Sequence, residues 1–161
     1  MRLFSQRVVT PEACVPAEVA VEDGQIVAVD LRDAPRSSAQ DWGDDLLIAG
    51  LIDIHTDNLE KHYQPRPGAT WDDVGAVMAH DGQCAAAGIT TVFDSLALHG
   101  VRSELNRREA FPARVAALEE ADALGLLRVE HLLHLRCEVT YAELLKALRR
   151  SKTIPGCNCC R

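Results

Sequence analysis

The feature that most constrains the fold is an apolar run that ends abruptly in residues able to bind a metal, within the stretch LLIAGLIDIHTDNLEKHYQPRPGAT at positions 46–70. Leu46 to Ile54 is mostly apolar and has the length of a buried strand. His55 and Asp57 follow it directly, and residues two apart at the end of a strand point to the same side. The pair could therefore hold one divalent cation. A surface histidine and aspartate at a strand end would give the same pattern, so the residues alone leave both interpretations open.

The rest of the chain alternates between strand-like and helix-like patterns. In the β-rich residues 1–30, Asp23-Gly24 lies between two apolar or alternating segments and predicts a hairpin. After the apolar run we expect a helix from Trp71 to Gly88, capped by Asp72 or Asp73, and then a strand at 89–98. A second helix is expected after Ser103, and Pro112 breaks or begins part of it. A strand within 126–139 and a short helix from Thr140 to Leu148 follow. This order predicts parallel βα units. A complete (β/α)₈ barrel needs about 250 residues, so the pattern predicts either a small open α/β sheet or part of a barrel.

Two carboxylates near the ends of predicted strands are further candidates for the site. The carboxyl ends of parallel strands gather on one face of a barrel, so Glu138 and Asp94 could join His55 and Asp57 there. A carboxylate such as Glu138 could bind one metal ion or bridge two, and water bound to the metal would be acidified to a usable hydroxide. Glu138 as a surface carboxylate and Asp94 as a hydrogen-bond acceptor at a strand end are the alternatives.

Two histidines and a group of cysteines are interpreted without a part in this site. His131 alternates away from the predicted site and is expected to pack or to form a hydrogen bond. His80 is expected on the solvated face of its helix. Cys157, Cys159 and Cys160 crowd the end of the chain, where no second ligand pair lies nearby. This cysteine pattern is not that of a secreted disulfide framework.

Cations close to predicted loops and strand ends are candidates for binding phosphate. These are Lys61, Arg66 and Arg136. Arginine matches the geometry of phosphate oxygens with two parallel hydrogen bonds. Each of these side chains, taken singly, could equally be a solvated surface charge.

Charge and hydropathy exclude two classes of partner. The net charge is −7, and no basic stripe is interleaved with aromatic residues. A surface for nucleic acid or for an acidic membrane is therefore not expected. No run approaches the roughly 18 to 20 apolar residues of a membrane span, and the N-terminus has no apolar segment of signal-peptide length. We therefore expect a cytoplasmic protein.

Three segments carry a family resemblance: GLIDIHTDNLEKHYQPRPGATWD (50–72), HDGQCAAAGITTVFDSL (80–96) and HLLHLRCEV (131–139). In these segments the sequence resembles the amidohydrolase superfamily, and more closely its PhnM branch, the α-D-ribose 1-methylphosphonate 5-triphosphate diphosphatases of phosphonate catabolism. The resemblance implies an α/β fold in which a small β-sandwich segment precedes a metal-dependent TIM-like (β/α) barrel. The expected domains are a β-rich segment at 1–45, the first βα units of the barrel at 46–150 and an aberrant or disordered tail at 151–161.

The same resemblance implies a reaction and a site. The reaction is hydrolysis of a small anionic sugar 5-triphosphate to the 5-phosphate with release of diphosphate, using one or two divalent ions, zinc or manganese. It implies that the metal ligands and catalytic residues are His55, Asp57 and Glu138. The substrate contacts that it suggests are Lys61, Arg66 and Arg136.

The resemblance fades near Arg150, which predicts an incomplete barrel and an N-terminal fragment with little or no diphosphatase activity of its own. An open barrel would expose apolar sheet edges and favour an oligomer or a complementing C-terminal half. One alternative is a non-catalytic binding or assembly module that pairs through such an edge. Another is a complete small α/β domain that binds one metal structurally.

Overall fold

The computed structural model describes residues 1–98 and 107–151, and the chain divides into two compact units, Met1–Ala49 and Gly50–Arg161. The predicted tail lies outside the described residues from position 152 onward. Among the helices described, none is long and apolar enough to cross a membrane.

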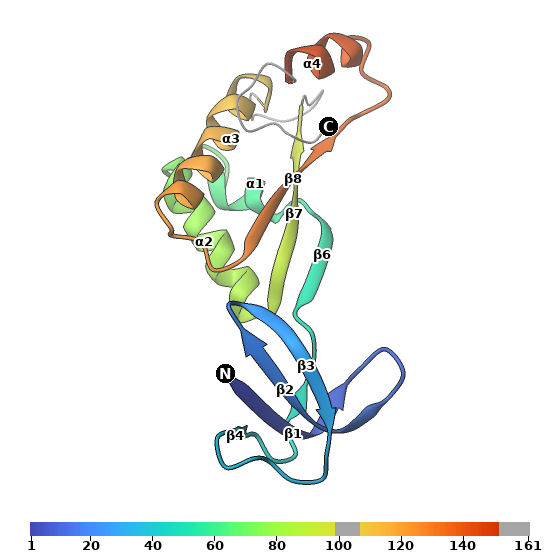
Figure 1. Cartoon of the computed structure of the whole chain (residues 1–161). Helices are drawn as coiled ribbons and strands as arrows, with labels where there is room; N and C mark the ends of the chain where they lie inside the picture. Colours follow the sequence, from blue (N-terminus) through green and yellow to red (C-terminus); the bar gives the residue numbers. More distant parts are fainter. Residues whose placement is uncertain (99–106, 152–161) are drawn as a thin grey trace. The chain divides into compact units, whose positions relative to one another are not determined.

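The first unit is a twisted sheet built around an antiparallel meander (Figure 1). Its strands are β1 (Arg2–Val9), β2 (Cys14–Glu22), β3 (Gln25–Leu31), β4 (Gln40–Asp41) and β5 (Leu46–Leu47). β1 to β3 pair in the order β3-β2-β1, while β4 and β5 both run parallel to β1. The predicted hairpin is confirmed: Asp23 and Gly24 have φ values of 49° and 76°, as a two-residue turn between twisted strands requires.

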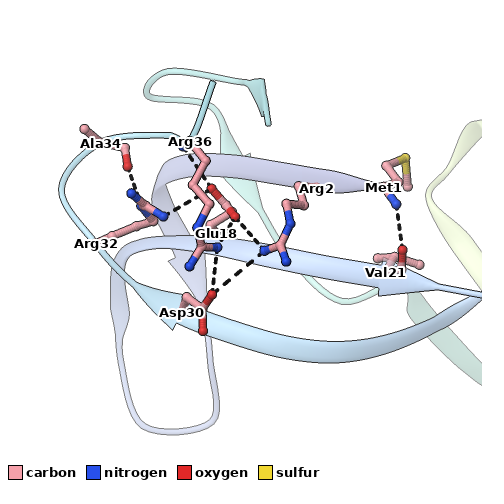
Figure 2. Close-up of polar contacts among 8 residues, drawn as sticks. All are labelled: Met1, Arg2, Glu18, Val21, Asp30, Arg32, Ala34 and Arg36. Atoms are coloured by element: carbon pink, nitrogen blue, oxygen red, sulfur yellow. Dashed lines mark hydrogen bonds and ion pairs between the residues drawn. The ribbon is translucent and has the colours of Figure 1, made fainter. Parts of the chain in front are cut away.

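A buried carboxylate is held by arginines in this first sheet, as Figure 2 shows. The Glu18 side chain is fully buried, and its Oε1 lies 2.8 Å from Arg2 Nη1. The Arg36 backbone N–H donates to Glu18 Oε2 over 3.0 Å, and Arg36 Nη1 also contacts Asp30 at 2.9 Å. Burial alone would raise the pKa of Glu18, but these hydrogen bonds and the Arg36 charge lower it to about 2. The carboxylate is therefore charged at any ordinary pH and ties β1 and β2 to the loop between β3 and β4 that carries Arg36.

The second unit is a parallel three-stranded sheet, which confirms the predicted parallel βα units. Its strands are β6 (Leu51–Thr56), β7 (Ile89–Ala97) and β8 (Glu130–Arg136), paired in that order. Its helices are α1 (Asn58–Tyr63), α2 (Asp73–Ala86), α3 (Arg107–Ala123) and α4 (Leu144–Ser151). α2 and α3 lie along one face of the sheet (Figure 1). Leu59, Leu96 and Val115 form part of the hydrophobic core of this unit.

The predicted ends of α2 are confirmed. Asp72 Oδ2 accepts a hydrogen bond of 2.7 Å from the Gly75 backbone N–H, which caps the helix start. Gly88, two residues after the helix, has φ 77°, a conformation that glycine adopts without a steric cost.

The predictions for Pro112 and for the 46–54 strand are wrong. Pro112 lies inside α3, which continues through it because its neighbour Phe111 is anchored in the core at 2% exposure. Residues 46–54 form two strands rather than one, since Leu46–Leu47 pair with β1 and β6 begins only at Leu51. β6 is also not buried: Ile54 is 73% exposed, because an edge strand has a neighbour on one side only.

Candidate metal centre

The predicted ligands lie at the carboxyl ends of the parallel strands, and Arg136 stands between Asp57 and Glu138. His55 is the penultimate residue of β6, Asp57 follows that strand directly, and Glu138 lies two residues beyond β8. Arg136 ends β8 and lies between the two carboxylates: its Nη1 is 3.0 Å from Asp57 Oδ1 and its Nη2 is 3.0 Å from Glu138 Oε1. The fold therefore brings together side chains that are 81 positions apart in the sequence (138 − 57).

Arg136 is held by this pair of carboxylates. Burial alone would lower its pKa, but Asp57 and Glu138 outweigh that effect and raise the pKa above its ordinary value. Both carboxylates keep substantial exposure, 43% for Asp57 and 39% for Glu138, so the three charges lie at an accessible edge of the sheet.

His55 is oriented toward Asp57 by a hydroxyl on the next strand. Its Nδ1 lies 3.0 Å from Ser95 Oγ in β7, and its Nε2 faces Asp57 Oδ1 at 3.8 Å. The His134 ring packs edge-on against it, with the ring centroids 5.0 Å apart. A partner on Nδ1 leaves Nε2 as the nitrogen available to a metal, which is the usual arrangement of a ligating histidine.

The donor types at the strand ends suit a divalent metal, although among the described residues the ligand atoms of His55, Asp57 and Glu138 do not all lie within 4.8 Å of one another. Asp57 Oδ1 is buried and lies 3.0 Å from Arg136, yet it accepts no well-aligned hydrogen bond. Arg136 supplies the cation beside this oxygen in the metal-free chain, and a divalent ion next to His55 Nε2 would take its place. One imidazole nitrogen and carboxylate oxygens suit zinc or manganese.

Two of the predicted substrate contacts lie away from this group. Lys61 is exposed on α1 and its Nζ donates to Asn58 Oδ1 over 2.8 Å. Arg66 is exposed in the turn after α1, where its backbone pairs with Ala69. Within the described residues, neither side chain forms a hydrogen bond or ion pair with the three predicted ligands, so their contact with substrate stays a prediction.

A second polar cluster lies on the opposite, helix-facing side of the sheet. His80 of α2 places Nε2 at 2.8 Å from Asp94 Oδ1, and His131 of β8 places Nδ1 at 2.7 Å from Asp94 Oδ2. The hydrogen-bonded role predicted for His131 and the acceptor role of Asp94 are confirmed. The convergence of Asp94 with His55 and the solvated position of His80 were wrong: Asp94 points to α2, and the His80 side chain is 1% exposed.

The spacing of polar and apolar residues along α2 already indicated this cluster. Val77, His80, Asp81 and Cys84 are spaced by three, one and three positions, which places them on one helical stripe. All four are buried against the sheet. Polar residues on an otherwise apolar stripe indicate a buried polar network. The prediction that His80 is solvated did not consider the apolar residues on the same stripe.

Comparison with known proteins supplies the remaining evidence. No family model matches the chain. It is 37% identical over 141 residues to the α-D-ribose 1-methylphosphonate 5-triphosphate diphosphatase of Escherichia coli K12, an alignment that covers 88% of this chain and 37% of that protein. It is 40% identical over 96 residues to an allantoinase of Streptomyces avermitilis, covering 57% of this chain and 20% of that protein. The chain thus spans well under half the length of the curated relatives that it matches.

Solved structures agree on the fold. The N-acetyl-D-glucosamine-6-phosphate deacetylase of Mycobacterium smegmatis aligns with a TM-score of 0.56 and 19% identity, over 93% of this chain and 43% of that one. An amidohydrolase from Brucella melitensis aligns with a TM-score of 0.52 and 9% identity, over 92% of this chain and 49% of that one. At these identities the likeness is one of fold.

Proposed function

We propose, from the premise that this chain is a PhnM-type relative within the amidohydrolase superfamily, that it provides metal-binding strands of a hydrolase acting on α-D-ribose 1-methylphosphonate 5-triphosphate. The products would be the 5-phosphate and diphosphate, so water is added across one phosphoric anhydride bond. The observation that supports this most is the position of His55, Asp57 and Glu138 at the carboxyl ends of parallel strands, the face where barrel enzymes place their sites.

The residues of this site divide into ligands and a positioning group. His55 Nε2 and the carboxylates of Asp57 and Glu138 would hold zinc or manganese, in one or two ions. A bound divalent ion supplies acidified water and offsets the negative charge of a phosphoryl group. Ser95, at 3.0 Å from His55 Nδ1, fixes the ring so that Nε2 is the nitrogen presented.

Arg136 supports the proposal that the substrate is anionic. Its guanidinium already contacts two carboxylates at 3.0 Å and is one-third exposed, so it can exchange a carboxylate oxygen for a phosphate oxygen without a large movement. Lys61 and Arg66 would extend the positive charge along the substrate as predicted. Release of diphosphate cleaves the anhydride bond between the α and β phosphates, and Arg136, the cation at the strand ends, is the one we place nearest to that bond.

The test is release of diphosphate from the 5-triphosphate by the purified chain with zinc or manganese added. The 161-residue chain spans 37% of the E. coli relative, so the assay is run on it alone and co-expressed with a polypeptide carrying the remainder of that relative. We expect little or no turnover by the chain alone and metal-dependent turnover in the mixture. That turnover should be lost in His55→Gln and kept in the exposed control Lys146→Gln. Equal turnover with and without functional His55 would overturn the proposal.

A second candidate, a non-catalytic assembly module, is favoured by one observation. The edge strand β6 leaves Ile52 63% exposed and Ile54 73% exposed. Exposed apolar side chains on a sheet edge favour association with another chain. If Ile54→Lys abolishes assembly with the complementing polypeptide while no mixture ever turns over the triphosphate, the assembly function is the correct one.

A further inference from the structure

The buried cluster on the helix-facing side of the sheet contains donors that the proposed reaction does not use. His80, Asp94 and His131 come from three separate elements, α2, β7 and β8. Their ligand atoms all lie within 4.8 Å of one another, and the three side chains are at most 2% exposed. We propose that these three residues form a binding site for a divalent transition metal, distinct from the site at the strand ends.

The donor atoms have the chemistry that such an ion requires. His80 offers Nε2, His131 offers Nδ1, and Asp94 offers a carboxylate whose two oxygens face one imidazole each at 2.8 and 2.7 Å. Neighbouring donors about 3 Å apart are compatible with bonds of about 2.0 to 2.2 Å to a common ion. Two imidazoles and one carboxylate select zinc, cobalt or nickel rather than calcium or magnesium.

A carboxylate behind one of the histidines has the position of an orienting partner. His131 Nε2 is buried without an aligned hydrogen bond, and Asp81 Oδ1 lies 3.5 Å from it. Asp81 Oδ1 is itself fixed by the backbone N–H groups of Arg128 and Val129, at 2.8 and 3.0 Å. Ligating histidines usually point their second nitrogen at such a carboxylate, which fixes the ring and strengthens the ligand. None of the residues in this arrangement belongs to the strand-end site.

A thiol and a cavity lie beside the three donors. Cys84 Sγ lies 3.7 Å from His80 Nε2, one helical turn along α2, but is not within 4.8 Å of all three ligand atoms. On the other side, His131 lines a cavity of about 370 Å³ between α3 and β8 whose wall includes Glu119 and Asp122. These carboxylates would favour the approach of a cation.

The experiment is a zinc titration of the chelator-stripped chain, with bound metal measured after equilibrium dialysis. In the His55→Gln variant, which removes a strand-end ligand, we expect one zinc ion to remain bound. Adding His80→Gln or His131→Gln to that variant should weaken this binding at least tenfold. The matched control is His62→Gln, because His62 is half-buried beside His80, with ring centroids 5.5 Å apart, but is not among the donors.

Two results would overturn the site: a His55→Gln variant that retains no zinc, or one whose zinc affinity does not depend on His80 and His131. Because a substitution inside the core could unfold the chain, the zinc absorption-edge spectrum of His55→Gln alone gives a second test. Scattering from two imidazoles is expected, and a spectrum without imidazole scattering would refute the proposal. Neither result depends on whether the strand-end site hydrolyses a triphosphate.

Discussion

Replacing Arg136 by glutamine should strengthen metal binding at the strand ends. In the metal-free chain the guanidinium contacts Asp57 Oδ1 and Glu138 Oε1 at 3.0 Å each. A metal that uses the same two carboxylates must break or weaken both contacts. Arg136→Gln removes the positive charge while keeping much of the length of the side chain, so the carboxylates become free to turn toward the ion.

The magnitude follows from the exposure of these groups. The three side chains are between 33% and 43% exposed, so each ion pair has the strength of a surface pair, up to about 1 kcal/mol. At about 0.2 to 1 kcal/mol each, two such pairs amount to roughly 0.4 to 2 kcal/mol of competition. Since 1.4 kcal/mol corresponds to a factor of ten, the dissociation constant should fall roughly 2- to 30-fold.

The assay is calorimetric titration with zinc or manganese in the presence of a competing chelator. Only the binding event that disappears in His55→Gln is assigned to the strand-end site. Lys146→Gln is the matched control, because Lys146 also pairs with a carboxylate, at 2.8 Å from Glu143, but lies on α4. An unchanged or weaker affinity in Arg136→Gln would show that the guanidinium does not compete with the metal.

Three further predictions concern the core, the buried carboxylate and the oriented histidine. Leu96 is 1% exposed, so Leu96→Ala should lower the free energy of unfolding by about 3 kcal/mol in denaturant titrations. The control Leu145→Ala, at 71% exposure, should lower it by at most about 0.5 kcal/mol. A loss under about 1 kcal/mol at Leu96 would contradict the packing of this side chain in the core. The pKa of Glu18 is lowered from 4.5 to about 2, so its stabilisation is complete above pH 4.5 and is lost as the pH falls through about 2. Thermal unfolding should therefore depend on pH in that window in the parent chain and much less in Glu18→Gln; parallel curves would refute the role of the arginines. Ser95→Ala should weaken metal binding at His55 roughly 10- to 100-fold in the calorimetric titration, and unchanged affinity would remove Ser95 from the site.

Local chemistry made much of the fold predictable. The Asp23-Gly24 hairpin and the cap at Asp72 depend on a few adjacent residues, so their sequence signals were sufficient. The position of Pro112 inside α3 and the exposure of Ile54 depend instead on which elements pack alongside them. Such partners are not specified by local propensity, and both predictions failed for that reason.

At the candidate site, too, some features were predictable from the sequence and others depended on the packing of side chains. His55, Asp57 and Glu138 could be grouped because parallel strands end on one face, which is a consequence of topology. The bridging position of Arg136 was not predictable, since it requires the side-chain geometry at the end of β8. The cluster around Asp94 was missed because each member was weighed alone, although the buried stripe of α2 indicated it.

The most direct test of the central claim is the anomalous diffraction of crystals of the chain grown with zinc. We expect an anomalous peak bounded by His55 Nε2 and the carboxylates of Asp57 and Glu138, with Arg136 turned away from at least one of them. Zinc bound elsewhere in the chain, with no peak at the strand ends and both 3.0 Å contacts of Arg136 retained, would contradict it.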